Sequence, residues 1–277
     1  MGILKTVLLT SAVLGLAAAA GAAAVVYGGL YNVAATSQHT QPVHTLLEIA
    51  MRQSVRLRAR AIEVPRLDDP QLVLRGAACF RDKCQQCHGG PGVAQGDIGK
   101  SMQPLPGPLV DARHHWKARE LYWVTKHGIK MSGMPAWEYR LAEQDLWAVV
   151  AFLERMPDLT AREYAEQTGR QATCGPGEAT VAGTPGDARR GARALHQYAC
   201  NACHSIPGIT GSSVHVGPPL DGIARRTMIG GRLANTPDNM VRWLRRTHEV
   251  DPRTAMPEMG LTEQDARDIA AYLSTLD

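Results

Sequence analysis

Apolar and polar positions divide the chain into a long apolar N-terminal run and a much longer mixed part. The run from Val7 to Tyr31 holds no charged residue and is rich in Leu, Val and Ala. As a helix it reaches about 37 Å, which is enough to cross a bilayer core of ~30 Å. The pattern predicts that residues 1–32 form a transmembrane anchor. A cleaved signal is the alternative, because Ala18–Ala20 and Ala22–Ala24 both fit a small-residue cleavage site.

The next segment, 33–66, is expected to form an amphipathic helix. Its apolar residues recur near helical spacing and its arginines fall on another face: Leu47, Met51, Val55 and Ile62 against Arg52, Arg56 and Arg60. We interpret the segment as a solvated spacer between the membrane and the rest of the chain. The alternative is a basic strip that lies on anionic headgroups or on a partner.

Helical periodicity continues in the mixed part. Two buried helix faces are predicted, one from Leu146, Val149, Val150 and Leu153 and one from Leu261, Ile269, Tyr272 and Leu273. Thr262 can cap the second helix, with Asp265 three residues on in a variant of the capping box. The sequence has no convincing alternating strand pattern. The expected fold class is therefore all-α.

The mixed part contains a tandem duplication. Cys84–His88 and Cys200–His204 both have the pattern C-x-x-C-H and are 116 positions apart. Met134-Pro135 and Met256-Pro257 follow them, and Leu141–Leu153 is matched by Leu261–Leu273 at an offset of 120. Three matches in the same order predict two copies of one domain, at 67–160 and 188–277. Because Gln167 to Asp187 is rich in Gly, Thr, Ala and Pro, residues 161–187 are expected to form a linker.

The C-x-x-C-H pattern indicates covalent haem attachment. Two thiols three positions apart can add to the two vinyl groups of one haem, and the adjacent His can ligate the iron. A zinc site needs four ligands close together, and neither copy supplies a second Cys/His pair. A thioredoxin-like redox pair gives no reason for His88 and His204.

Both copies resemble class I cytochrome c domains, so the whole chain is similar to a membrane-anchored dihaem cytochrome c. The resemblance implies two covalently bound haem c groups, on Cys84 with Cys87 and on Cys200 with Cys203. It implies His88 and His204 as iron ligands on one side. Met134 and Met256 are the expected second ligands, because a thioether sulfur is a soft ligand that raises the potential.

The resemblance also implies supporting contacts. In the second copy, Gly191 is expected to pack against Tyr272, and the carbonyl of Pro218 in Gly217–Leu220 is expected to accept from His204. The first copy offers Gly76 with Phe152, but reads Pro106-Gly107-Pro108-Leu109. Pro106 and Pro108 are both candidates for the carbonyl that faces His88. Trp243 is expected near the haem edge, with Trp123 as its approximate counterpart.

Other side chains compete for the second ligand position. Met131 lies three residues before Met134, and Met259 three residues after Met256. His114, His115 and His127 can also ligate iron, but a His in a polar stretch is usually solvated. The motif favours Met134 and Met256.

The function implied by the resemblance is electron transfer without bond chemistry. Two six-coordinate irons leave no open position for a substrate, so we expect a carrier between a quinol-oxidising complex or similar donor and a terminal oxidase. Haem attachment places both domains and the spacer in the periplasm, with the anchor in the bacterial inner membrane. A net charge of +4, from 30 Lys and Arg against 26 Asp and Glu, does not indicate a nucleic-acid binder.

Three other functions remain open from the sequence. A cytochrome subunit of a periplasmic dehydrogenase has the same modules and differs only in its redox partner. A dihaem peroxidase also has two C-x-x-C-H motifs, but it needs one open iron, whereas both copies here offer Met-Pro. Thiosulfate-type catalysis requires a Cys ligand, for which Cys79 or Cys174 would have to serve.

Haem attachment uses four of the six cysteines and leaves Cys79 and Cys174 without a role. An oxidising periplasm does not readily tolerate two free thiols, and their number is even. We therefore predict a Cys79–Cys174 disulfide that fixes the linker to the first domain. The alternative is a buried Cys79 and an exposed thiol at Cys174.

Overall fold

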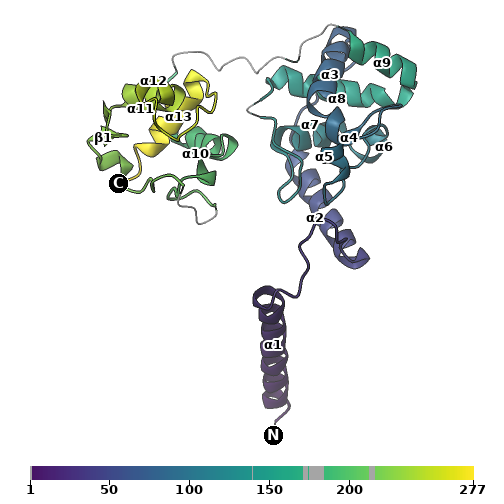
Figure 1. The fold of residues 1–277 in the computed structure, drawn as a ribbon. Helices are drawn as coiled ribbons and strands as arrows, with labels where there is room; N and C mark the ends of the chain where they lie inside the picture. Colours follow the sequence, from purple (N-terminus) through teal and green to yellow (C-terminus); the bar gives the residue numbers. More distant parts are fainter. Residues whose placement is uncertain (1, 139, 171–173, 175–183, 212–215) are drawn as a thin grey trace.

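The computed structural model describes residues 2–138, 140–170, 174, 184–211 and 216–277. Its helices gather into two bundles, which Figure 1 shows beside each other. The N-terminal bundle holds α3 (Pro70–Lys83), α4 (Gln85–His88), α5 (Asp97–Lys100), α6 (Ala112–His115), α7 (Ala118–His127), α8 (Glu143–Arg155), η1 (Met156–Asp158) and α9 (Ala161–Gly169). The C-terminal bundle holds α10 (Ala188–Gln197), η2 (Cys200–Ala202), η3 (Ile223–Arg225), α11 (Pro237–Arg245), α12 (Thr247–Val250) and α13 (Glu263–Leu273). The all-α prediction is confirmed, with helix in 56% of the chain.

Helix α1 (Ile3–Tyr27) stands apart from both bundles. It has 25 residues, a mean hydropathy of 2.0 in its most apolar window and no buried side chain. Its length and composition suit either a membrane anchor or a signal sequence.

Each bundle is organised around the crossing of its first and last long helices, α3 with α8 and α10 with α13. A glycine makes both crossings possible. A Cβ on Gly76 would lie 1.9 Å from the carbonyl oxygen of Ala148, and one on Gly191 would lie 2.0 Å from that of Asp268. Phe152 and Tyr272 pack beside these glycines, as the sequence predicts. Any larger residue would force the helices apart.

The core of the N-terminal bundle is aromatic. Phe80, Phe152 and Tyr164 are fully buried, with ring centroids 5.6 to 6.3 Å apart. Tyr164 comes from α9, which the sequence assigned to the linker. That assignment is wrong for Ala161–Gly169, because Thr160 and Glu163 form a capping box that starts a helix and Tyr164 anchors it on α3.

The predicted disulfide between Cys79 and Cys174 is confirmed. The two Cα atoms are 4.6 Å apart, within the range that a disulfide bridges. Cys79 is fully buried on α3, so the bond attaches the chain beyond α9 to the bundle core. The rest of the predicted linker between 171 and 183 lies outside the described residues.

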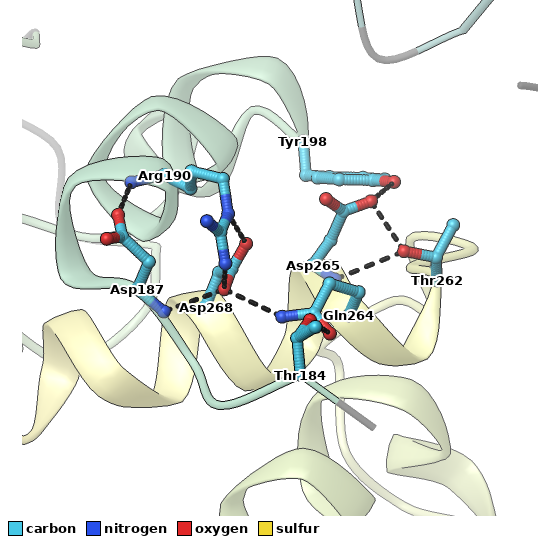
Figure 2. Close-up of polar contacts among 8 residues, drawn as sticks. All are labelled: Thr184, Asp187, Arg190, Tyr198, Thr262, Gln264, Asp265 and Asp268. Atoms are coloured by element: carbon cyan, nitrogen blue, oxygen red, sulfur yellow. Dashed lines mark hydrogen bonds and ion pairs between the residues drawn. The ribbon is translucent and has the colours of Figure 1, made fainter. Parts of the chain in front are cut away.

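Polar groups hold the crossing in the C-terminal bundle, as Figure 2 shows. The carboxylate of Asp268 is 2% exposed and accepts two hydrogen bonds from Arg190, at 2.7 and 2.9 Å. It also accepts from the backbone N–H of Asp187 and from Gln264. The hydroxyls of Tyr198 and Thr262 both donate to Asp265, at 2.8 and 2.7 Å. The predicted capping of α13 by Thr262 is confirmed.

The C-terminal bundle also contains a short two-stranded hairpin. β1 (Met228–Ile229) pairs antiparallel with β2 (Leu233–Ala234). Two residues per strand are too few for an alternating pattern to show in the sequence.

Helix α2 (Gln41–Ala59) is not a free spacer. Its C-terminal half packs on α7, with Val55 and Ala59 buried. Arg52 pairs with Glu48 and lies 5.0 Å above the ring of Trp116. The interpretation of this segment as a solvated spacer is therefore wrong for the C-terminal half of α2. The sequence shows that the helix has an apolar face, but it does not show which element covers that face.

Candidate functional site

The first C-x-x-C-H motif lies where α3 ends and α4 begins. Cys84 is the residue between the two helices, and its N–H donates to the carbonyl of Phe80. Cys84 is 7% exposed, and burial raises the pKa of its thiol to about 12. Neither Cys84 nor Cys87 is in a disulfide. The motif thus presents two free thiols one helical turn apart.

The second motif has a different local backbone but also presents two free thiols followed by a histidine. Cys200 begins the short helix η2, which follows Ala199 in a left-handed conformation, and Cys203 is the residue directly after the helix. Burial raises the pKa of the Cys200 thiol to about 11. Both thiols are free, and His204 follows as His88 does in the first bundle.

Both histidine rings are oriented by a backbone carbonyl. Nδ1 of His204 lies 2.8 Å from the carbonyl oxygen of Pro218, the acceptor that the sequence predicts. Nδ1 of His88 lies 2.7 Å from that of Gly107. The prediction of Pro106 or Pro108 is wrong. The acceptor is the residue two positions before the Leu in both segments, so counting back from Leu109 would have found it.

These contacts leave Nε2 as the ring nitrogen available to a metal. Burial lowers the pKa of His88, against the smaller opposite effect of its bond to Gly107, and so favours the neutral ring that a ligand needs. Among the described residues no group of three His, Cys, Asp or Glu is placed to hold a metal ion by itself. Paired free thiols beside an oriented imidazole fit covalently bound haem.

The two candidate methionines lie in loops with the same turn. The N–H of Met134 donates to the hydroxyl of Ser132, and that of Met256 to Thr254, both at 3.2 Å. The sequence analysis missed Ser132 and Thr254. The shared pattern of a hydroxyl residue two positions before Met-Pro could have found them, because such residues form local turns.

Gly128 is a further residue that the sequence analysis missed. It has a φ of 65°, and a Cβ there would lie 2.6 Å from the carbonyl oxygen of Met134. The N–H of Ile129 also donates to this oxygen, at 3.1 Å. The end of α7 therefore holds the Met134 loop in place, and only glycine fits at the contact.

The competing ligands are placed less favourably. Met131 is 98% exposed, whereas Met134 is half-buried. Met259 is 38% exposed, whereas Met256 packs against the core of its bundle. His114 and His115 both contact Asp111, and His127 lies 3.5 Å from Glu138. Trp123 packs beside His127, and Trp243 packs against the C-terminal core.

Comparison with protein families agrees with this geometry. The model for cytochrome c oxidase, cbb3-type, subunit III matches residues 71–153, and the model for cytochrome c matches residues 188–277. Both bundles are cytochrome c domains. Each binds one haem covalently, so this tandem cytochrome c carries two c-type haems and transfers electrons.

Two further comparisons add little. Curated proteins give no match. Among solved structures, the chain is similar to one titled "Kuenenia stuttgartiensis reducing HAO-like protein complex Kustc0457/Kustc0458". The identity is 17%, the match covers 78% of this chain and 99% of that chain, and the TM-score is 0.26.

The two cytochrome c domains touch through Arg140. Its guanidinium lies 4.6 Å above the ring of Tyr198 and donates to the carbonyl of Gln197 at 2.9 Å. The main helix-to-helix contacts all lie within one bundle or between α2 and α7. The described contact between the domains is therefore small and polar.

Proposed function

We propose that this protein is a membrane-anchored dihaem carrier that moves single electrons from a respiratory donor, such as a quinol-oxidising complex, to a terminal oxidase. The observation that carries the proposal is the repetition of one ligand set, His with Met-Pro, in both domains. A haem bound in this way supplies a one-electron iron couple. The periplasmic location follows from c-type haems, which are typically extracytoplasmic.

The chain's own residues have distinct roles in this proposal. Cys84 with Cys87, and Cys200 with Cys203, hold the haems. His88 and His204 are ligands, and the carbonyls of Gly107 and Pro218 fix their ring orientation. Met134 and Met256 are the second ligands, on loops shaped by Ser132 and Thr254.

The ligand set is tested by four single variants of the holoprotein. Met134→Ala and Met256→Ala should each open one iron, so that the reduced protein binds about one carbon monoxide and one potential falls. Met131→Ala and Met259→Ala are the matched controls and should bind none. Carbon monoxide binding that appears in a control shows that Met131 or Met259 is the ligand instead. Carbon monoxide binding to the unmodified protein shows an open iron and favours a peroxidase.

The carrier role is tested with the reduced holoprotein and membranes that contain a terminal oxidase. Oxidation of both haems that is blocked by cyanide supports the proposal. A dehydrogenase subunit is the alternative within electron transfer. It is favoured if the protein purifies with a dehydrogenase from native membranes and is reduced by that enzyme's substrate while quinol-oxidising complexes leave it oxidised.

A further inference from the structure

One face of α2 carries apolar side chains that no described residue covers. Val43, Leu46, Leu47 and Leu57 are 38, 68, 53 and 56% exposed. At about 100° per residue, these four positions fall within an arc of about 100° on the helix. The buried residues Val55 and Ala59 lie on a different side. The helix thus packs on α7 with one face and leaves a second, apolar face exposed.

Basic residues lie on both sides of this apolar stripe. By helical position, Arg58 is on one side and Arg56 and Arg60 are on the other. Arg56 and Arg60 also line a groove of about 550 Å³. Its remaining cationic side chains come from α6 and the start of α7, and they include Arg113, Lys117 and Arg119.

The groove keeps a positive charge that the protein does not neutralise. Its carboxylate, Glu120, is 6% exposed and accepts the N–H of Lys117 at the start of α7. Arg113 is neutralised by Asp158, with bonds of 2.7 and 2.9 Å. Within the described part of the chain, no ion pair is formed by the four other cations of the groove, Arg56, Arg60, Lys117 and Arg119.

We propose that the apolar stripe of α2 and this groove, together the α2 surface, dock on anionic phospholipid headgroups. The stripe enters the boundary between headgroups and acyl chains, and the long basic side chains beside it reach the lipid phosphates. This is the arrangement of an interfacial amphipathic helix, with lysines and arginines around an apolar face. The N-terminal domain then lies against the membrane surface.

The length of chain before α2 favours lipid as the occupant, and here the inference rests on the proposed anchor. Residues 28–40 connect α1 to α2. Even fully extended, these residues reach only about 45 Å. A helix held this close meets lipid at a high effective concentration. A redox partner is the other class of occupant, and the experiment separates the two.

The test is hydrogen exchange of the full-length holoprotein in lipid nanodiscs. One set of discs contains phosphatidylglycerol, and the other contains only phosphatidylcholine. We expect the amides of residues 43–50 to exchange at least about tenfold more slowly in the anionic discs, because docking suppresses opening of this exposed helix. High salt should remove the difference.

Two double variants remove the two parts of the α2 surface. Arg56→Gln with Arg60→Gln should weaken docking about 30-fold, since each cation near an anionic leaflet contributes a factor of about five. Leu46→Gln with Leu47→Gln should abolish the protection without touching the core. Arg189→Gln with Arg253→Gln changes the charge equally on exposed residues of the other domain and should leave the protection unchanged.

The outcomes distinguish the docking from the anchor. A chain that does not co-elute with the discs contradicts the anchor. Retention in the discs without protection of α2, or equal protection in both lipids, overturns headgroup docking. Protection that appears only when a redox protein is added also overturns it and assigns the α2 surface to a protein.

Discussion

The two domains hold the same helix crossing with different side chains. In the N-terminal domain, Gly76 sits beneath α8, and the surrounding contacts are aromatic rings and one ion pair, between Arg75 and the buried Asp145. The Cys79–Cys174 disulfide is attached to the same helix. In the C-terminal domain, Gly191 sits beneath α13, and the contacts around it are polar and charged. The glycine is what the geometry requires, whereas the stabilising contacts can be replaced.

The difference between the two crossings is clearest at the residue that faces the glycine from the other helix. Ala148 and Asp268 occupy equivalent places, since both contribute the carbonyl that faces the glycine. Ala148 leaves room for aromatic packing, whereas Asp268 collects four hydrogen bonds. Both domains have an apolar core, but the N-terminal crossing adds aromatic packing, one buried ion pair and a covalent bond, whereas the C-terminal crossing adds a network of hydrogen bonds whose members depend on one another.

The largest expected effect comes from removing the covalent bond. Cys79→Ala with Cys174→Ala should destabilise the N-terminal domain by up to about 4.7 kcal/mol, the entropic value for a closed loop of about 100 residues. Peptide-resolved hydrogen exchange measures each domain separately. The C-terminal domain serves as the internal control, and equal destabilisation of both domains contradicts the comparison.

The second prediction replaces the polar network by the residue that the other domain uses. Asp268→Ala should destabilise the C-terminal domain by about 2–3 kcal/mol, because Arg190, Gln264 and the Asp187 N–H lose their acceptor. Asp221→Ala, at an exposed carboxylate, is the matched control and should change stability by less than about 0.5 kcal/mol. An unchanged Asp268→Ala protein would show that the network contributes nothing.

Much of this comparison could be predicted from the sequence. The duplication, the glycine and aromatic pairs, the Pro218 carbonyl and the disulfide all rest on residues whose role is local or fixed by the family pattern. The position of α2, the packing of α9 and the Gly107 acceptor were missed or wrong. An amphipathic face does not name its partner, one aromatic on a polar helix gives a weak signal, and Pro-Gly in place of Gly-Pro hides which carbonyl is available.

The third prediction is that the two domains lose stability at different pH values. Burial opposes ionisation of Asp268, but bonds from Arg190, Asp187 and Gln264 outweigh it and lower the pKa of this carboxyl. The folded pKa therefore lies below the unfolded value of ~3.9. The resulting stability is present above that value and is lost as the pH falls toward the folded pKa.

Acid should therefore open the crossing of α10 with α13 before that of α3 with α8. The second crossing also holds a buried ion pair, Arg75 with Asp145, but its aromatic contacts and its disulfide do not titrate in this range. Exchange measured from pH 5 to 2.5, corrected for the intrinsic rate, checks the order. Asp268→Ala should flatten the response of the C-terminal domain. Parallel acid profiles for the variant and the unmodified protein would assign the pH dependence to other groups.

The smallest expected effect concerns the contact between the domains. Arg140 lies over the Tyr198 ring and donates to the Gln197 carbonyl. Because this side chain is exposed, the cation–π contact contributes only about 0.5–1 kcal/mol, which changes the population of the joined arrangement by about 2- to 5-fold.

Arg140→Ala should slow electron exchange between the two haems by a similar factor after photoreduction of one of them. Tyr198→Phe keeps the ring beneath Arg140 while it removes the hydroxyl that bonds to Asp265, so it should leave the exchange rate unchanged although it weakens the C-terminal domain. If Tyr198→Phe slows exchange as much as Arg140→Ala does, the rate depends on the internal network of the C-terminal domain rather than on the contact between the two domains.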